Sequence, residues 1–312
     1  MKHYEKRYNS MNIVSSSDDR LAQFIPVQLA SIGVNLKDIS VDFYLLYHNI
    51  SPLKLKAIRK SVQRFPNINL HCVHIANLSP YRLLADFGGG WPPETYFSLE
   101  CHKYLPETAD RAFFIDAGDI IFLGCPTDYN SDFEGASLIV AQTREPYKDA
   151  PINRKLLKTK AGLFFVAQGY FDSGAYLINL KKFRDLNLSI DSFINLARSM
   201  PNQFTAKMRP NIGSKYFGDE GLLSTAFIGD MKFSNAGRGL GYRPFNFRLE
   251  MFDEAVLYFG QQSIPDYSPV VIHFAGVPKP WTMPDSSILK PAQIPYFNVW
   301  NSLASESLTH EP

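Results

Sequence analysis

A chain of 312 residues is long enough to bury a substantial core, as one large α/β domain or as two ordinary domains. Hydrophobic residues make up 45% of the sequence and charged residues 20%, which is ordinary for a globular protein. The formal net charge is only +2, and Lys and Arg are scattered along the chain, which argues against a nucleic-acid-binding protein.

Three features of the sequence favour a cytoplasmic location. The cysteines, Cys72, Cys101 and Cys125, are odd in number and widely spaced, which favours free buried thiols in a reducing compartment. No stretch approaches the ~18 consecutive apolar residues of a transmembrane helix. The first ten residues, MKHYEKRYNS, are charged and lack the apolar segment of a secretory signal. We interpret residues 1–10 as an N-terminal appendage.

The first half of the chain alternates strand and helix patterns. An apolar strand is predicted at Met11–Ser15, and a helical pattern follows over Leu21–Ile32. Further strands are predicted at Val41–Tyr47, Leu70–Ile75 and Ala112–Phe122, and helices at Pro52–Phe65 and from about Glu94. Strands that alternate with helices indicate βαβ units. The predicted fold class is therefore α/β, with a mixed, mainly parallel sheet flanked by helices.

Beyond Leu123 the alternation becomes less regular. The polar segment Arg144–Lys160 is interpreted as a lid over a bound substrate, with a solvated loop or an oligomer contact as the alternatives. The predicted elements of this half are strands at Ser137–Ala141, Ala175–Asn179 and Pro269–Phe274 and helices at Ile190–Ser199 and Glu220–Phe227. Because no low-complexity linker divides the chain, we expect one domain over residues 11–285 and a C-terminal helical tail over residues 286–312.

Two aspartates interrupt the apolar segment AFFIDAGDIIF, residues 112–122. Positions three apart in a strand point to opposite faces, but Gly118 can adopt a positive φ and turn the chain so that Asp116 and Asp119 converge. Convergent carboxylates repel unless a cation lies between them, and oxygen ligands suit Mg²⁺ or Mn²⁺. The alternative is that one aspartate caps a turn and the other is solvated.

A second polar group follows a predicted strand in VVIHFAGVPKPW, residues 270–281. His273 comes at the end of the strand, and an imidazole nitrogen is a good third ligand for Mn²⁺. Gly276 allows close approach of the backbone, and Lys279 lies between two prolines, where its charge could neutralise phosphate. The alternative is that His273 is a satisfied core histidine.

The segment YFDSGAYLINLKKF, residues 170–183, carries a third polar group. Asp172, Ser173 and Gly174 come just before a predicted apolar strand. A plain turn before an edge strand is the alternative interpretation, with Asn179 as the N-cap of a following helix.

Taken in order, these segments resemble the retaining nucleotide-sugar glycosyltransferases of family 8, which include bacterial lipooligosaccharide galactosyltransferases and glycogenin. The segments that carry the resemblance are MNIVSSSDD (11–19), ETYFSLECHKYLPETADRAFFIDAGDIIF (94–122), YFDSGAYLINLKKFR (170–184), GDEGLLS (218–224), FNF (245–247) and IHFAGVPKPW (272–281). The resemblance extends from Met11 to Trp281 and implies a GT-A-type, Rossmann-like fold.

The resemblance also implies a function and its residues. A hexose would pass from a UDP-sugar to a hydroxyl of a glycan or lipid-linked saccharide acceptor, with retention, in bacterial surface polysaccharide or lipopolysaccharide assembly. This function is compatible with a cytoplasmic enzyme that is peripheral at the inner face of the membrane. The implied residues are Asp116, Asp119 and His273 for Mn²⁺ (or Mg²⁺), Ser16, Ser17, Asp18 and Arg20 for uridine, Gly276 and Lys279 for the diphosphate, and Asp172, Ser173, Asp219 and Glu220 for the donor sugar. Glu220, Asp219 and Asp172 are the implied catalytic candidates.

The sequence departs from the family pattern at several of these positions. The usual DxD motif has an extra residue in DAGD, and Leu21 replaces an aromatic residue that often stacks on uracil. Ser98 stands where a donor-binding arginine is usual, and Arg82 is a candidate substitute. Glu220 stands where many members carry glutamine. The missing arginine and aromatic residue motivate one alternative, a nucleotide-sugar or glycan-binding module that has lost turnover. A different metal-dependent enzyme, such as a pyrophosphatase, is a further alternative, but it leaves the Lys279 loop unexplained.

Overall fold

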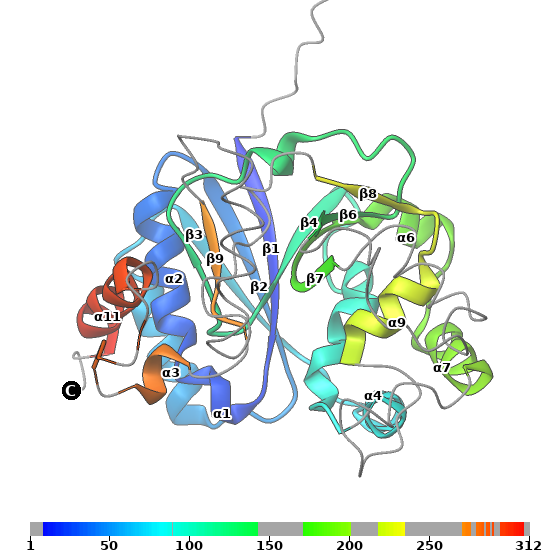
Figure 1. The fold of residues 1–312 in the computed structure, drawn as a ribbon, viewed down its shortest axis with the longest axis horizontal. Coiled ribbons are helices and arrows are strands. Elements are labelled where there is room, and N and C mark those ends of the chain that lie inside the picture. Colours follow the sequence, from blue (N-terminus) through cyan, green and yellow to red (C-terminus); the bar gives the residue numbers. More distant parts are fainter. Residues whose placement is uncertain are drawn as a thin grey trace, which may run out of the picture.

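The computed structural model describes residues 9–88, 90–142, 171–200, 218–234, 270–275, 279–283, 285–287, 289 and 294–308. A seven-stranded sheet in the order β3-β2-β1-β4-β7-β6-β8 forms its centre, and a two-stranded sheet, β5-β9, lies beside it (Figure 1). Pairs β3-β2, β2-β1, β1-β4 and β6-β8 are parallel, whereas β4-β7 and β7-β6 are antiparallel. The predicted mixed, mainly parallel sheet is confirmed.

The N-terminal half consists of βαβ units, as its alternating pattern predicts. Its elements are β1 (Ser10–Ser17), α1 (Asp19–Ala22), α2 (Ile25–Asn35), β2 (Ser40–Tyr47), α3 (Pro52–Val62), β3 (Ile68–His74) and α4 (Ser79–Phe87). The prediction of a single helix over Leu21–Ile32 is wrong, because the helical conformation is interrupted between α1 and α2. Pro26 lies in the first turn of α2, where its missing N–H costs nothing, and its ring would clash with a helix continuing from α1.

The remaining elements surround the second half of the sheet. They are η1 (Pro93–Lys103), β4 (Arg111–Asp116), β5 (Ile120–Phe122), η2 (Thr127–Asn130), β6 (Leu138–Gln142), β7 (Phe171–Asn179), α6 (Leu180–Asp185), α7 (Ile190–Ser199), α9 (Gly218–Ala226), β8 (Met231–Phe233), β9 (Val271–His273), η4 (Pro280–Thr282) and α11 (Ile294–Leu308). Asn179 caps α6, since its side chain accepts a hydrogen bond from the backbone N–H of Lys182, and this part of the alternative interpretation of residues 170–183 is confirmed.

Strand β7 differs from the sequence prediction at its start and in its position. It begins at Phe171 rather than near Ala175, so Asp172–Gly174 lie within the strand and not in a turn before it. It also lies between β4 and β6, so it is not an edge strand. Because Asp172 and Ser173 are polar, the first residues of this strand do not belong to an apolar run, and the sequence pattern indicates only the part from Ala175 onward.

Helices cover both faces of the sheet and bury two large apolar clusters. One lies between the sheet and α2 and α3, and the other lies on the side of η1, α4, α7 and α9. A third cluster joins β5 and β9 to α2 and α11, with Trp300 and Phe297 of α11 packed against Val27 and Ala30 of α2. Helix α11 therefore runs along α2 although the two are distant in the sequence (Figure 1).

The state of the cysteines and the lengths of the helices can be compared with the sequence. All three cysteines are free thiols, but only Cys101 is buried, whereas Cys72 and Cys125 are half-buried. Within the part of the chain that the structure describes, none of the helices is both long and apolar enough to cross a membrane.

The buried carboxylate of Glu100 joins η1 to α4 and α7. It accepts hydrogen bonds from Tyr81 Oη of α4 at 2.8 Å and from the backbone N–H of Ile190, the first residue of α7, at 2.7 Å. Lys103 Nζ binds the same carboxylate. A buried charge with three donors is costly to remove because the donors lose their acceptor.

We expect Glu100→Ala to lower the free energy of unfolding by about 3 kcal/mol or more, because it leaves these donors unsatisfied. Urea denaturation of the purified variant measures this loss. Lys181→Ala is the control, since it breaks only the exposed Lys181–Asp185 pair of α6 and should cost less than about 0.5 kcal/mol. Equal losses in the two variants would contradict the role of Glu100.

Candidate functional site

The DAGD turn connects β4 to β5 and brings its two aspartates to one side. β4 ends at Asp116, β5 begins at Ile120, and Gly118 between them has a φ of +73°, in the left-handed region that favours glycine. A side chain at Gly118 would also meet Phe24, since its Cβ would lie 2.8 Å from Phe24 Cβ. The turn predicted from Gly118 is therefore present, and it lies directly against the start of α2.

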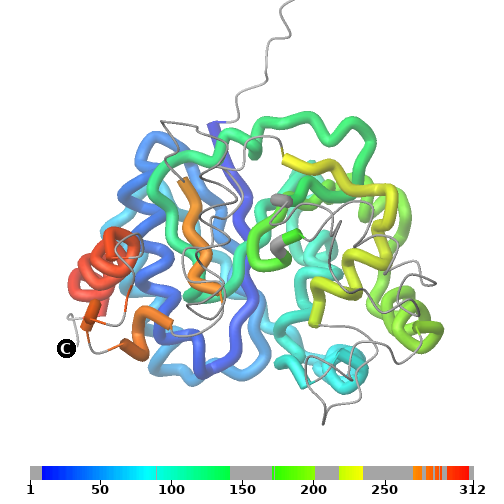
Figure 2. Tube along the Cα trace, in the orientation of Figure 1, coloured from blue at the N-terminus to red at the C-terminus, as the bar shows by residue number. Residues whose placement is uncertain are grey.

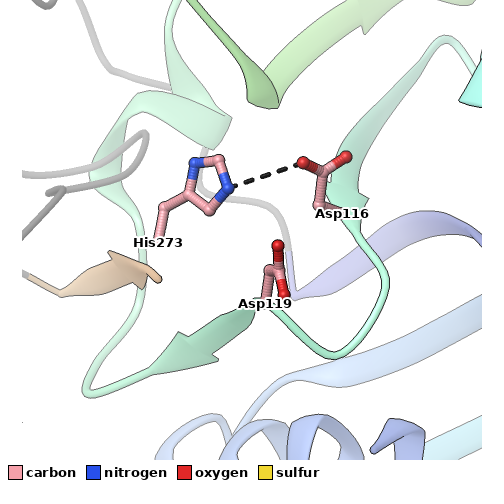
Figure 3. Close-up of side chains that lie close together, drawn as sticks. All are labelled: Asp116, Asp119 and His273. Carbon is pink, nitrogen blue, oxygen red and sulfur yellow. Dashed lines mark ion pairs between the residues drawn. The ribbon is translucent and has the colours of Figure 1, made fainter. Parts of the chain in front are cut away.

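The third residue of the cluster comes from the far end of the chain. β9 pairs antiparallel with β5, with His273 opposite Ile120, so the orange tube of β9 runs beside the green segment after β4 (Figure 2). One ligand atom each of Asp116, Asp119 and His273 lies within 4.8 Å of the others, and the side chains point toward one another (Figure 3). His273 Nε2 lies 3.5 Å from Asp116 Oδ2.

The chemistry of this cluster fits a divalent cation. Asp119 Oδ1 is buried and has no hydrogen-bond partner among the described residues, while Asp119 Oδ2 is bound by Lys279 Nζ. Burial raises the pKa of Asp119 above its usual value, although the charges of Lys279 and His273 act in the opposite direction. An unsatisfied buried carboxylate oxygen next to a second carboxylate and an imidazole is the donor set that Mn²⁺ and Mg²⁺ proteins use.

Lys279 is fixed by three contacts. Its ammonium binds Asp119 Oδ2, donates to the carbonyl oxygen of Phe274 at 2.8 Å, and lies 5.6 Å from the ring centroid of Trp281. This places a positive charge immediately beside the three candidate metal ligands, where it can also meet an anionic substrate.

Gly174 of β7 is the reason that His273 can occupy its position. A Cβ on Gly174 would lie only 2.1 Å from His273 Cε1, so the imidazole occupies the space that any side chain at position 174 would need. The sequence contained a signal for this contact, since a glycine inside a strand often marks close approach of another group. The signal was missed because the strand was predicted to begin after Gly174.

Helix α9 places two more carboxylates near the cluster. Asp219 and Glu220 are buried in its first turn, and Ser173 Oγ donates to Asp219 Oδ1 at 3.3 Å. Burial raises the pKa of Asp219 well above its usual range, and the charges of Asp116 and Glu220 raise it further. Asp219 is therefore close enough to Asp116 for the charge of Asp116 to raise its pKa. The hydrogen bond from Ser173 to Asp219 connects β7 to α9.

The residues after β1 lie along the same edge of the sheet. Ser16 is opposite Asp116 in the parallel pairing of β1 with β4. Asp18 caps α1 by accepting a hydrogen bond from the backbone N–H of Leu21 at 2.8 Å, and Ser17 Oγ donates to the carbonyl oxygen of Asp18. The exposed Arg20 lies 3.7 Å from Asp18. Their role in binding uridine remains a prediction.

Two departures from the family pattern can be located in the fold. Ser98 is buried in η1, so the position of the usual arginine points into the interior, whereas the candidate substitute Arg82 is exposed on α4. A buried carboxylate that the sequence did not indicate, Glu94 of η1, interacts electrostatically with Arg82 and Asp18. Burial raises the pKa of Glu94, Asp18 raises it further, and the positive charges of His48 and Arg82 lower it.

Several predicted features lie outside the described residues. They are Gly276, the side chain of Asp172, the segment Arg144–Lys160 and the FNF segment at residues 245–247. Their predicted roles stay predictions.

The model of glycosyl transferase family 8 matches residues 12–235, which is most of the chain. This chain belongs to glycosyl transferase family 8. A lipopolysaccharide 1,2-glucosyltransferase from Escherichia coli (strain K12) is 21% identical over 284 residues, covering 87% of this chain and 72% of the relative.

Solved structures show the same fold at low sequence identity. The galactosyltransferase LgtC, in complex with donor and acceptor sugar analogues, matches with a TM-score of 0.66 and 21% identity, covering 97% of this chain and 98% of LgtC. The glycosyltransferase GlyE from Streptococcus pneumoniae TIGR4 matches with a TM-score of 0.55 and 19% identity, covering 96% of this chain and 63% of GlyE. The GT-A fold expected for this glycosyltransferase is therefore confirmed.

We expect Gly174→Ala to weaken Mn²⁺ binding ~10-fold or more, because the new methyl group must displace His273 from the cluster. Titration calorimetry with Mn²⁺ measures the change. Gly33→Ala is a matched control, since its Cβ would lie 2.2 Å from the ring of Phe65, a comparable clash away from the cluster. The control should lose stability but keep its Mn²⁺ affinity, and unchanged affinity in Gly174→Ala would contradict the assignment of His273.

Proposed function

We propose that this glycosyltransferase moves a hexose from a UDP-sugar to an acceptor hydroxyl, with retention of configuration, and that it depends on Mn²⁺ or Mg²⁺. The observation that carries the proposal is the convergence of Asp116, Asp119 and His273 around an unsatisfied carboxylate oxygen, beside Lys279. Bound by these three residues, the cation would neutralise charge on the departing diphosphate, as a Lewis acid does.

The roles that we propose for the surrounding residues are those that the resemblance to the family implies. Lys279 holds Asp119 and supplies a fixed positive charge for the diphosphate, the kind of preorganised electrostatic contribution that is often the largest in catalysis. Gly276 would allow the diphosphate to approach the backbone of the same loop. Ser16, Ser17, Asp18 and Arg20 would bind uridine at the end of β1, and Ser173 would face the donor sugar.

The relatives suggest the acceptor class and the location. The E. coli relative is a lipopolysaccharide glucosyltransferase, and LgtC is a galactosyltransferase. We propose that the acceptor is a glycan or a lipid-linked saccharide in bacterial surface polysaccharide or lipopolysaccharide assembly. The reaction would take place in the cytoplasm, at the inner face of the membrane when the acceptor is lipid-linked.

Release of UDP from a panel of UDP-hexoses, with and without Mn²⁺, tests this function directly. We expect turnover with at least one donor, loss of turnover in EDTA, and recovery when Mn²⁺ is restored. Asp119→Ala should abolish Mn²⁺-dependent UDP binding without unfolding the protein. UDP binding without turnover of any donor would favour the alternative of a binding module.

The proposed reaction leaves open the route to retention, and Glu220 is the residue that bears most directly on it. Retention requires either a covalent glycosyl-enzyme formed by a carboxylate or attack of the acceptor from the face that the diphosphate leaves. Many family members carry glutamine at this position, and an amide is a poor nucleophile. Glu220 is buried in the first turn of α9, with Asp219 beside it and Asp172 on β7 as rival carboxylates, so a nucleophilic role is chemically open to it.

We expect Glu220→Gln to separate a nucleophile from a carboxylate that gains ~0.3–1 kcal/mol from the N-terminus of the helix. The substitution keeps the shape of the side chain and removes its charge. A nucleophile would lose ~10³-fold or more in kcat, about 4 kcal/mol, with donor affinity unchanged. Steady-state kinetics and UDP-sugar binding measure both quantities. A variant that keeps most of its kcat would show that Glu220 lines the sugar pocket without taking part in the reaction.

A further inference from the structure

Helix α2 presents a row of polar side chains to the segment that carries the two aspartates. Gln28, Ser31 and Asn35 are spaced i, i+3, i+7, which places them on one face of the helix. Ser31 Oγ accepts a hydrogen bond from the backbone N–H of Phe122 at 3.0 Å, and Asn35 Nδ2 donates to the carbonyl oxygen of Phe122 at 2.9 Å. Gln28 and Ser31 are fully buried, which is costly for polar side chains unless they are hydrogen-bonded.

Gln28 contacts the metal-binding turn itself. Its Nε2 donates to the carbonyl oxygen of Asp116 at 2.9 Å and to that of Ile120 at 3.3 Å. These two carbonyl groups lie at the two ends of the turn that contains Ala117, Gly118 and Asp119. The side-chain amide of Gln28 therefore joins the end of β4 to the start of β5.

Contacts from outside the turn hold it along its length. The carbonyl oxygen of Asp119 accepts a hydrogen bond from the backbone N–H of Phe274, the residue after β9, at 2.8 Å. Phe24 lies against Gly118 in the middle of the turn, and Gln28 contacts both of its ends. The geometry of the turn therefore depends on these surroundings.

We propose that Gln28 is a positioning residue for the metal site, and that it fixes the separation of the Asp116 and Asp119 carboxylates. The inference rests on the proposed function, because it assumes that these carboxylates hold a cation. Two convergent carboxylates repel each other, so a turn that is free to open separates them and lowers metal affinity. Groups that orient ligands without touching the metal typically change its affinity 10- to 100-fold when they are removed.

A purely structural role for Gln28 makes a different prediction. If the amide only satisfies two buried carbonyl groups, its loss lowers stability and leaves metal affinity unchanged. Asn35 supplies the comparison, because its amide also bridges two carbonyl groups, those of Ser31 at 3.0 Å and Phe122 at 2.9 Å. The two amides lie on the same face of the same helix, but only Gln28 reaches the turn.

The experiment compares Gln28→Met with Asn35→Leu and the wild-type protein. Methionine matches the length of glutamine and donates no hydrogen bond. The dissociation constant for Mn²⁺ is measured from the spin-resonance signal of free Mn²⁺, with and without UDP, and stability is measured by urea denaturation. We expect Gln28→Met to raise the dissociation constant ~10-fold or more, and Asn35→Leu to lose stability at unchanged Mn²⁺ affinity.

The outcomes separate this inference from the function on which it rests. Equal Mn²⁺ affinity in wild type and Gln28→Met, or equal weakening in Gln28→Met and Asn35→Leu, would overturn the role of Gln28 alone. A wild-type protein that binds no Mn²⁺ even with UDP would overturn the metal site and the inference with it. If Gln28→Met fails to fold, Gln28→Asn replaces it, since that amide is one methylene too short to bridge both carbonyl groups and should weaken Mn²⁺ binding in the same direction.

Discussion

The buried carboxylate of Asp119 is the constraint that organises this site. A carboxylate in the interior is stable only with charged or hydrogen-bonding partners, and here Lys279 binds one of its oxygens while His273 lies close to it. Lys279 and His273 both come from the C-terminal part of the chain, so that part must return to the centre of the sheet. The pairing of β5 with β9 achieves this return, because it places His273 opposite Ile120.

Two helices that carry no candidate metal ligand, α2 and α11, support the site. The ring of Phe24, just before α2, stacks on Trp281 at a centroid distance of 4.3 Å, and Trp281 lies 5.6 Å from Trp300 of α11. Lys279 lies over the same Trp281 ring. The position of the lysine thus depends on α2 and α11 together, which gives the C-terminal helix a physical connection to the candidate metal site.

The candidate acids fall into two environments with different chemistry. Asp116 and Asp119 belong to a turn that Lys279, His273 and Gln28 surround with positive charge and hydrogen-bond donors. Asp219 is instead buried in α9, and its pKa is raised well above its usual range by that burial first and then by the charges of Asp116 and Glu220. Asp116 therefore belongs to both environments, since it is a candidate metal ligand and its charge also acts on Asp219.

The sequence by itself determined the βαβ alternation, the turn at Gly118 and the N-cap at Asn179. These features are local, since each depends on residue periodicity or on the conformational preference of one residue within a few positions. Only the tertiary structure decided the start of β7, the contact of Gly174 with His273 and the bridge from Gln28 to the DAGD turn. In the sequence Gln28 is one of three polar residues in the otherwise apolar helix α2, and its partners are carbonyl groups that every residue possesses. No pattern of side chains can therefore identify such a contact, because it exists only when the packing of α2 against β4 and β5 brings the amide to those two carbonyl groups.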